Sequence, residues 1–579
     1  MNPENEIDNL INRLKIRNRA AREEASKQLQ LYGEAVIPKL GKLLMESSGV
    51  VAEAAALILS KIGTPAIPTL AKALREGGHG RRKYASLALA EIGISAMPVL
   101  EEAATDKDRG VRWRAFNALS RIGAPSIPFI VTKLLESDED TRQLILQSSR
   151  WELTRADTPE LEQRDAEGNS VVPCLIQLLE QNDRDIQFFG MGMLEKIGLP
   201  ATHYIAEYIT HCDNEIAEKN CVSTLRGIIF GSVKDSEVAG SILQKYTSAL
   251  LEKASPYVDV AEVHLSARDY QQALNSGDSR VWRERLSNEY RLLFWDLGVL
   301  AVPVLAPAWL KGARQEKEFS SLVMELAFDF DDFFSLPHIP FRNPRHYKGP
   351  ISPDDKIFSE LNSSSLEDVD KVVTALEYKY EKILDDTRQE RKAKLDSLMK
   401  RLPEMEPSER ERTLMRERAK FQNISNTLNL VRERAIQTIR DKGVMMLPRI
   451  IEMIQSGDDD RCLCALEAIS VIDGVDRDVL LNNSDLVSIL IRFIKIPHHW
   501  YRTRAMASAL HIGQPLLPFL SEYASTAHDE VDKLAAVAAM GSIGEKARAY
   551  IEPFTLDPNR AVSAFSRWYL AKLSNETWE

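Results

Sequence analysis

A short stretch recurs along the first part of the chain, and one copy of it reads Ala85-Ser-Leu-Ala-Leu-Ala-Glu-Ile-Gly-Ile-Ser-Ala-Met-Pro98. Its last six residues follow the pattern Gly-x-x-x-(Ile/Met)-Pro, which occurs four times at intervals of thirty residues, at Gly33 to Pro38, Gly63 to Pro68, Gly93 to Pro98 and Gly123 to Pro128. An alanine stands eight residues before each glycine and a leucine four residues before it, the alanines being Ala25, Ala55, Ala85 and Ala115. This spacing places the three positions on one face of a helix, so the sequence predicts a helical repeat.

Each repeat is predicted to be a pair of helices joined by a tight turn. The glycine ends the first helix because it adopts the left-handed conformation at little cost. The proline begins the second helix, at a position whose N–H has no intrahelical partner. The small alanine lets neighbouring helices approach closely. Since one pair cannot bury its own apolar face, the pairs must stack. The predicted fold class is therefore all-α, an α-α superhelix or solenoid.

The segment Val111-Arg112-Trp113-Arg114-Ala115, followed by Gly123, carries a family resemblance. It resembles HEAT repeats, and among them the short bacterial type named after phycobilisome lyase subunits, in which an inner helix opens Val-Arg-x-x-Ala and ends near Gly. The resemblance implies a HEAT-like solenoid of outer and inner helices. It points to a scaffold and not to an activity, because one fold hosts many functions.

The repeat pattern weakens after Pro128 and returns in later copies, at Val172 with Gly198, at Gly298 to Pro303, at Gly443 to Pro448 and at Gly513 to Pro518. A polar stretch from Asp157 to Asn169 is interpreted as an inserted loop. We therefore divide the chain into an N-terminal HEAT-like array (1–230), irregular helical repeats (231–327), a Pro- and aromatic-rich insertion (328–365), a helical hairpin (366–430) and C-terminal HEAT-like repeats (431–579).

Two features of the middle region do not follow the repeat. The insertion opens with Phe328-Asp-Phe-Asp-Asp-Phe-Phe334, which makes Phe330, Phe333 and Phe334 candidate partner-binding residues. The alternative is an irregular connector packed on neighbouring helices. The hairpin is predicted from apolar residues alternately three and four apart, from Leu366 to Ile383 and again from Phe421 to Ala435. This coiled coil either projects from the solenoid or lies along it as an oversized repeat.

Arginines gather where the predicted inner helices begin. Matched repeat positions hold Arg22, Arg82, Arg112 and Arg142, and Arg502 occupies the same position in a later copy. In one interpretation these side chains form an internal ladder with carboxylates such as Asp106 or Asp108, because acidic residues stand in register at Glu76, Asp106 and Glu136. In the other they line a groove for phosphate or an acidic protein segment. Four basic residues off the ladder position, with one tryptophan, are the better partner-binding candidates: Arg81, Lys83, Arg109, Trp113 and Arg114.

Composition limits the classes of function. The chain has 579 residues, 44 % of them hydrophobic and 27 % charged, with a net charge of −11. That balance disfavours a global polyanion binder. The charge is uneven, since residues 1–122 hold 19 basic and 14 acidic side chains and residues 123–230 hold 9 and 18. Five cysteines give no disulfide framework and indicate a reducing compartment. With no signal-peptide pattern at Met1 and no uninterrupted apolar run of about twenty residues, we expect a cytoplasmic protein without a membrane span.

The sequence contains no recognisable catalytic or metal-binding motif. The sequence has no phosphate-binding glycine loop, zincin helix or nucleophile elbow. His203, His211, Cys212 and Cys221 lack a zinc-site spacing, and Cys462 and Cys464 face different sides of one helix. We therefore predict no catalytic residue, no metal and no cofactor. His498-His499-Trp500-Tyr501 is either an exposed aromatic patch or the packed start of an inner helix.

The leading functional prediction is a noncatalytic scaffold that binds protein partners, within a multisubunit assembly, through its solenoid surfaces and the hairpin. One alternative is a tetrapyrrole (bilin) lyase or chaperone, which the name of the repeat type implies. The other is binding of a nucleic-acid backbone by a basic N-terminal concave patch, which the net acidity disfavours.

Overall fold

The computed structural model describes residues 3–16, 18–153, 169–230, 233–258, 279–328, 436–455 and 459–574. Every regular element in these ranges is a helix, α or 3-10, and no strand occurs among them. The all-α solenoid prediction is thereby confirmed. The chain divides into two compact units, Met1–Thr224 and Leu225–Glu579, which are described separately below.

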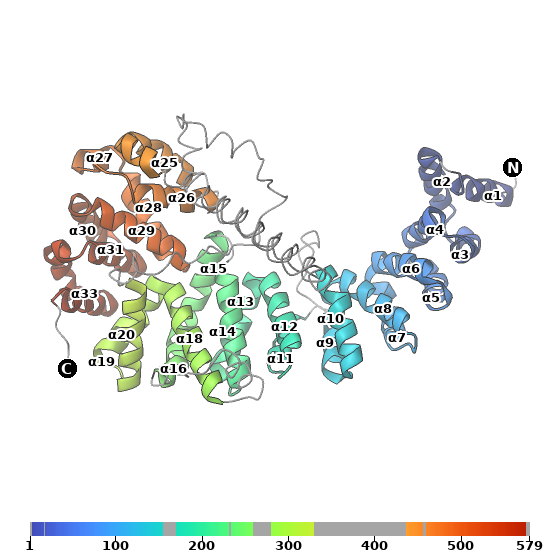
Figure 1. Ribbon diagram of the computed structural model, residues 1–579, viewed down its shortest axis with the longest axis horizontal. Coiled ribbons are helices and arrows are strands. Elements are labelled where there is room, and N and C mark those ends of the chain that lie inside the picture. The colour runs from blue at the N-terminus through green and yellow to red at the C-terminus, as the bar shows by residue number, and fades with distance from the viewer. Residues whose placement is uncertain are drawn as a thin grey trace, which may run out of the picture. The chain divides into compact units, whose positions relative to one another are not determined.

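Unit 1 is built from two layers of stacked helices (Figure 1). Layer A consists of the helices that precede the recurring glycines, and of α10, which no such glycine follows: α2 (Arg19–Leu31), α4 (Gly49–Ile62), α6 (His79–Ile92), α8 (Arg109–Ile122), α10 (Glu139–Leu153) and α12 (Arg184–Ile197). Layer B consists of the helices that follow them: α3 (Ile37–Glu46), α5 (Ile67–Glu76), α7 (Met97–Ala103), α9 (Ile127–Glu136), α11 (Val172–Leu179) and α13 (Leu199–His211). Helix α1 (Pro3–Leu14) precedes the array, and α14 (Glu215–Ile229) crosses the boundary to unit 2. Each layer-A helix packs on the next.

The apolar face predicted for layer A is the one that is buried. The four repeat alanines and four repeat leucines are all fully inaccessible to solvent: Ala25, Ala55, Ala85, Ala115, Leu29, Leu59, Leu89 and Leu119. Methyl groups at the alanine positions leave room for the next helix, and the leucines fill the space between layers. Deleting or enlarging either kind of side chain therefore disturbs the stacking itself.

Three repeat glycines end their helices in a conformation more restrictive than the left-handed helical one: Gly63, Gly93 and Gly123. Gly63 has φ 85° and ψ −141°, and Gly123 has φ 88° and ψ −138°. These values lie outside the left-handed helical region that Asn also visits, and close to a region that is essentially restricted to Gly. A 3-10 turn such as η2 (Thr64–Ala66) follows, and Pro68 lies in the first turn of α5. In the copy at Gly198 this turn is missing, and α13 begins at once with Pro200 in its first turn.

Unit 2 contains two segments that flank the insertion. The early segment comprises α15 (Val233–Leu243), α16 (Thr247–Ala254), α18 (Ser279–Leu297), the 3-10 turn η7 (Gly298–Ala301), α19 (Val302–Lys311) and α20 (Arg314–Phe328). The late segment comprises α25 (Leu447–Gln455), α26 (Asp459–Ile469), α27 (Arg477–Asn482), α28 (Asp485–Lys495), α29 (His499–Ile512), α30 (Leu517–Thr526), α31 (Glu530–Ser542), α32 (Arg548–Ile551) and α33 (Arg560–Leu573).

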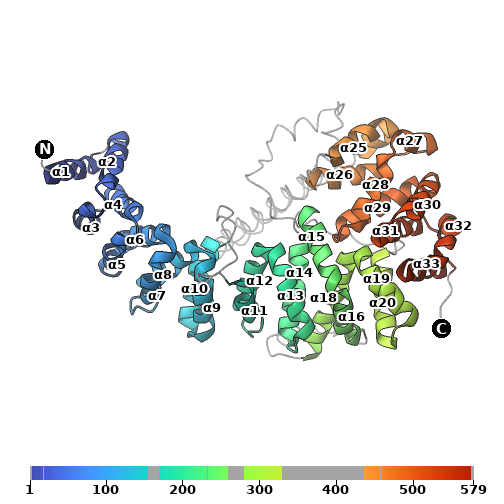
Figure 2. The ribbon, with the colours of Figure 1, turned by 180° about the vertical axis from the view of Figure 1, so that it is seen from behind.

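The late segment packs against the early one, as Figure 2 shows from behind. Helix α33 packs on α19, while α28 and α31 both contact the turn η7. At the end of α20, the buried ring of Phe328 lies edge-on to Phe565, with centroids 5.1 Å apart, and also meets Trp568 and Tyr569. Segments separated by more than a hundred residues of sequence thus share one core.

Several predictions fall outside the described residues. The insertion beyond Phe328, with Phe330, Phe333 and Phe334, and the hairpin 366–430 are among them. Within the described ranges, two stretches are long and apolar enough to cross a membrane by length and composition, His79–Ala103 and Arg283–Lys311. Each consists of two helices joined by a 3-10 turn at a positive-φ glycine, Gly93 or Gly298.

Candidate functional site

Two ladder arginines of unit 1, Arg82 and Arg112, reach a carboxylate at the start of the next layer-A helix. The guanidinium of Arg82 on α6 lies 2.7 Å from Asp108 Oδ2 and donates to the carbonyl of Arg75. Asp108 also accepts the N–H groups of Gly110 and Val111 as the N-cap of α8. These contacts, with Arg82 the largest, hold the pKa of Asp108 below its ordinary value. One repeat further on, Arg112 reaches Asp140 at 3.4 Å.

The acidic register used to predict this ladder is not the one that the structure shows. The carboxylate of Asp106 accepts the backbone N–H of Asp108 at 2.8 Å, and only its carbonyl accepts from Arg112. Glu76 and Glu136 pair with lysines of their own helices. The ends of the array differ as well, since Arg22 donates to the carbonyl of Ile16 and Arg142 pairs with Glu139 of its own helix.

The off-ladder candidates divide into two groups. Arg81 and Arg109 are engaged internally: Arg81 Nε donates to the carbonyl of Ser47 at 3.1 Å, and Arg109 lies 3.5 Å from the Asp140 carboxylate that Arg112 also uses. Lys83 is exposed and forms no ion pair with a described residue. Only part of the predicted set is therefore available as unneutralised charge.

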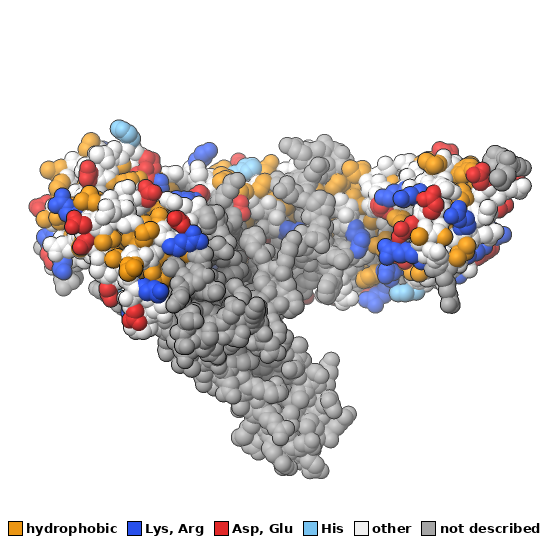
Figure 3. Space-filling view, turned by 90° about the horizontal axis from the view of Figure 1, so that it is seen from above, with side chains coloured by type: hydrophobic (Ala, Val, Ile, Leu, Met, Phe, Trp, Pro, Cys, Tyr) orange, Lys and Arg blue, Asp and Glu red, His pale blue; other side chains and the backbone are white. Residues whose placement is uncertain are grey.

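Three residues remain, Lys83, Trp113 and Arg114, which we call the basic-aromatic patch. The Arg114 guanidinium lies 4.5 Å from the centroid of the Trp113 ring and 3.3 Å from Nε2 of His79. Partial burial lowers the pKa of Arg114. In the repeat register Lys83 and Trp113 occupy equivalent positions on the adjacent helices α6 and α8. Figure 3 shows Lys and Arg side chains gathered on the face of unit 1 that is seen there, with acidic ones between them.

A second polar site, in the interior of unit 2, joins the early and late segments. We call Arg226, Glu289, Asp296, His499 and Arg502 the buried polar cluster. The fully buried carboxylate of Asp296 lies 2.8 Å from Arg226 Nε and 2.6 Å from Nδ1 of His499. Arg226 also reaches Glu289 at 3.1 Å. The Asp296–His499 and Asp296–Arg226 contacts bring α18 together with α29 and α14.

Burial is the largest influence on the pKa values of Asp296 and His499. At Asp296 burial is outweighed by the hydrogen bond from His499 and by the charge and hydrogen bond of Arg226, so the pKa is lowered and the carboxylate is ionised. At His499 burial prevails over Asp296, so the pKa is lowered. A neutral ring must then carry its proton on Nδ1, because an ionised carboxylate only accepts hydrogen bonds. The ring stacks on Trp295 with centroids 4.2 Å apart, which fixes its orientation.

Arg502, at the ladder position of α29, performs a different task from its counterparts in unit 1. Its guanidinium donates to the carbonyls of Trp295 and Asp296 at the end of α18. A cation there satisfies carbonyls without intrahelical partners and complements the helix dipole. Gly298, with φ 52°, passes so close that a Cβ atom would overlap the guanidinium. Burial lowers the pKa of Arg502 to about 10.

The stretch His498 to Tyr501 is the packed start of a helix and not an exposed patch. His498 and His499 are each only 6 % exposed, and Phe230 meets both rings edge-on. Nδ1 of His498 is buried without a hydrogen-bond partner among the described residues, and burial lowers the pKa of His498 to about 3. The imidazole is therefore an apolar packing element at neutral pH.

The other residues with possible chemistry do not assemble into a site. In the ranges that the structure describes, no three His, Cys, Asp or Glu side chains are grouped to hold a metal. Cys212, Cys221, Cys462 and Cys464 are buried, and burial raises the pKa of the Cys221 thiol.

Sequence reasoning missed the buried polar cluster because its members lie far apart in the chain. The available signal was Arg502 at a ladder position, just after two adjacent histidines and with no acidic residue in register. The partner of that arginine is a helix end more than two hundred residues earlier, which no local spacing reveals.

Comparison with known proteins supports the repeat assignment. A profile of HEAT repeats matches residues 80–150, and one described as PBS lyase HEAT-like repeat matches residues 51–76. Both matched segments thus have the sequence pattern of HEAT repeats, and that of residues 51–76 is of the PBS-lyase-like type. No curated protein matches the chain.

Solved structures of other solenoids align along most of the chain at low similarity. Importin beta is 12 % identical, with 98 % of this chain and 89 % of that one covered and a TM-score of 0.28. Yeast importin-beta (Kap95p) is 13 % identical, with 98 % and 88 % covered and a TM-score of 0.26. Kap121p is 13 % identical, with 99 % and 57 % covered and a TM-score of 0.27. Scores this low carry no argument about function.

Proposed function

We propose that this chain, a HEAT-repeat solenoid, is a noncatalytic scaffold that binds protein partners, and that the basic-aromatic patch of unit 1 is one of its contact surfaces. The observation that supports this most is the cation–π arrangement of Arg114 on Trp113, with the exposed Lys83 at the position on the adjacent helix α6 that corresponds to Trp113. Tryptophan and arginine are the residues that dominate binding energy at protein interfaces. Because packed helices hold them in place, less conformational entropy is lost on binding than with a flexible segment.

The charge of the patch favours an acidic protein segment as its partner. Four of the nearby guanidinium groups already bond to other parts of the chain, those of Arg81, Arg82, Arg109 and Arg112. Few unneutralised cations are left for phosphates, whereas binding of a nucleic-acid backbone depends on many Lys and Arg contacts. One or two carboxylates beside an apolar side chain match what the patch offers. Among the described residues, no arrangement supports the bilin-lyase alternative.

We also infer a cytoplasmic setting, because the five cysteines, four of them buried, form no disulfide with one another. The hairpin 366–430 and the aromatic residues Phe330, Phe333 and Phe334 stay proposals as further contact surfaces within a multisubunit assembly.

The proposal is tested by charge reversal combined with affinity purification. Full-length protein at native abundance is compared with the double variant Lys83→Glu/Arg114→Glu, and bound proteins are quantified by mass spectrometry. A matched control, Lys27→Glu/Lys107→Glu, makes the same change of net charge at exposed positions of unit 1 away from the patch. We expect a stoichiometric partner to be retained by the control and lost from the patch variant. A partner retained equally by both variants would contradict the assignment of the patch.

A further inference from the structure

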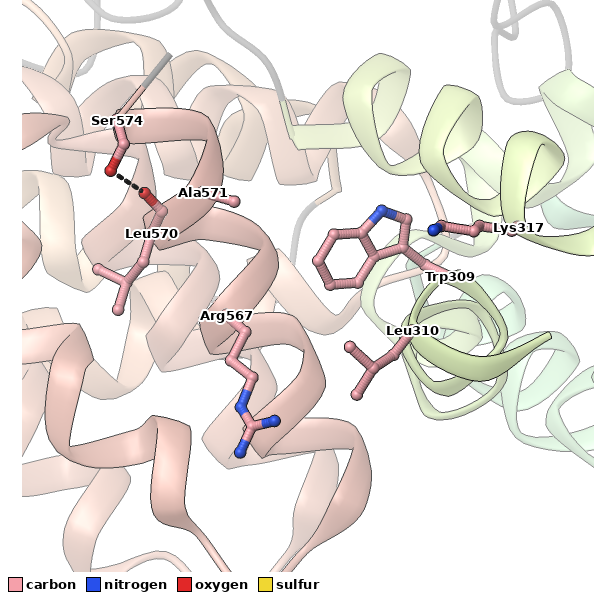
Figure 4. Close-up of a pocket in the computed structure, with 7 residues that line it drawn as sticks. All are labelled: Trp309, Leu310, Lys317, Arg567, Leu570, Ala571 and Ser574. Atoms are coloured by element: carbon pink, nitrogen blue, oxygen red, sulfur yellow. Dashed lines mark hydrogen bonds between the residues drawn. The ribbon is translucent and has the colours of Figure 1, made fainter. Parts of the chain in front are cut away.

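A pocket lies in unit 2 where the late segment meets the early one. It has a volume of about 410 Å³ and is lined by Trp309, Leu310, Lys317, Arg567, Leu570, Ala571 and Ser574. Trp309 and Leu310 come from the end of α19, Lys317 from the first turns of α20, and the other four from the last two turns of α33 and the residue after it (Figure 4). Since α33 packs on α19, the pocket belongs to a core that the two segments share.

The inner part of the pocket is apolar. Trp309 is 8 % and Ala571 7 % exposed, so they form its floor, and Leu570 is half-buried beside them. Leu310 is 37 % exposed at the mouth, where an apolar side chain of this size is usually covered. Figure 4 shows the indole of Trp309 and the side chain of Leu310 directed toward α33, the helix that carries Arg567. This space suits one large apolar side chain, since pockets of a few hundred Å³ are typical binding sites.

The rim of the pocket is cationic. Its two ionisable lining residues are Lys317 and Arg567, both exposed, in a chain whose net charge is −11. Arg567 donates to the carbonyl of Thr555 at 3.2 Å, which holds the guanidinium in place while leaving donors available. Neither cation forms an ion pair with a carboxylate in the part of the chain that the structure describes. The neighbouring Arg314, by contrast, is paired with Glu318 at 2.8 Å.

We propose that this pocket binds an acidic linear segment of a protein partner, which buries one large apolar side chain between Trp309 and Leu570 and places carboxylates near Lys317 and Arg567. Charge complementarity selects an acidic segment, because two cations at the rim attract carboxylates that no described residue supplies. A linear segment fits better than a small molecule since the cations and Leu310 are exposed at the mouth, whereas small-molecule sites bury most of their ligand. This inference deepens the proposed function, on which it rests for the class of partner, and uses a different unit of the chain.

The test uses full-length protein and a defined probe. The probe is a fluorescein-labelled peptide of eight residues with one central Phe flanked by Asp and Glu, and its binding is followed by fluorescence anisotropy. Two matched probes replace the Phe by Ser, or the acidic residues by Asn and Gln. The protein variants are Lys317→Glu, Arg567→Glu and Leu310→Asp, with Lys546→Glu as an exposed control outside the pocket. All four positions are exposed, so the variants should fold, which circular dichroism verifies.

We expect saturable binding that weakens at least tenfold in each pocket variant, is unchanged in Lys546→Glu and falls with added salt. Both altered probes should also bind at least tenfold more weakly. Absence of saturable binding up to 1 mM peptide would overturn the proposal, as would equal binding of the Phe and Ser probes, which indicates charge attraction alone. Displacement of the peptide by micromolar laurate, at a concentration below the peptide's own Kd, would assign the pocket to a small amphiphile instead. The affinity-purification test of Lys83→Glu/Arg114→Glu is independent of this pocket. If that variant loses the partner, the proposed function holds whichever of these results the peptide experiment gives.

Discussion

Replacing Asp296 by Asn tests whether the buried polar cluster holds the early and late segments of unit 2 together. The substitution keeps the shape of the side chain and one acceptor for His499, but it removes the charge that neutralises Arg226. A second contact between the same segments serves as the control. Glu237 on α15 pairs with Arg492 on α28 at 3.2 Å, with 40 % and 53 % of the two side chains exposed. Both carboxylates therefore link the same two parts of the chain, and they differ in burial.

The expected magnitudes follow from that difference. Removing one partner of a buried ion pair costs about 3–5 kcal/mol, since an uncompensated charge is left inside. Arg226 is mostly buried and would retain only Glu289. An exposed pair contributes about 0–1 kcal/mol, because water screens it. Asp296→Asn should thus strongly destabilise the packing of the late segment on the early one, and Glu237→Gln should hardly affect it.

Amide hydrogen exchange of the full-length protein provides a local readout. In Asp296→Asn, the amides at the end of α18 and the start of α29 should exchange on the order of 10²- to 10³-fold faster than in the wild type. In Glu237→Gln the change should be about fivefold at most. Equal exchange in the two variants would refute the reasoning, because it would mean that the buried cluster contributes no more than a surface ion pair.

Other perturbations of the repeats are also predictable. Gly63→Ala should cost about 1–3 kcal/mol from backbone strain alone, and Gly298→Ala more, because its methyl group displaces Arg502; equal melting temperatures would contradict this. Ala85→Leu should cost about 1–3 kcal/mol by overpacking two repeats, measured by urea unfolding, and a neutral effect would deny close packing there. The His498 ring is neutral in the folded protein, whereas its pKa in the unfolded chain is about 6.5. As the pH drops from 6.5 towards 3, the free energy of unfolding should therefore fall by up to about 1.4 kcal/mol per pH unit. His498→Gln should reduce this pH dependence.

The repeat architecture could be predicted because its determinants are local. One stretch of nine residues contains Ala85, Leu89 and Gly93. Its spacing is enough to predict the helix, the face that is buried and the residue at which the helix ends. The positive φ predicted for the repeat glycines is present at Gly33, Gly63, Gly93 and Gly123, but ψ at Gly63 and Gly93 differs from that of the left-handed helical region. The left-handed helical conformation ends many helices, but this turn leads directly into a 3-10 segment and requires ψ near −140° at Gly63 and Gly93.

The sites were harder to predict because they depend on pairings between repeats. The four arginines of the ladder look alike in sequence, yet Arg82 reaches the next repeat and Arg142 turns to its own helix. The pocket beside Trp309 was not predicted either, since α19 and α33 come together only through the packing of the late segment on the early one. Spacing identifies equivalent positions, while the surroundings decide which side chain each position meets.

The proposed function requires that a preformed helical surface of unit 1 contacts a protein partner. Hydrogen–deuterium exchange of the full-length chain, alone and in the complex purified from native extract, tests it most directly. We expect slowed exchange in α6 and α8, the helices that carry Lys83, Trp113 and Arg114, and no slowing when Lys83→Glu/Arg114→Glu is taken through the same extract. A stable complex that leaves the exchange of both helices unchanged would contradict it.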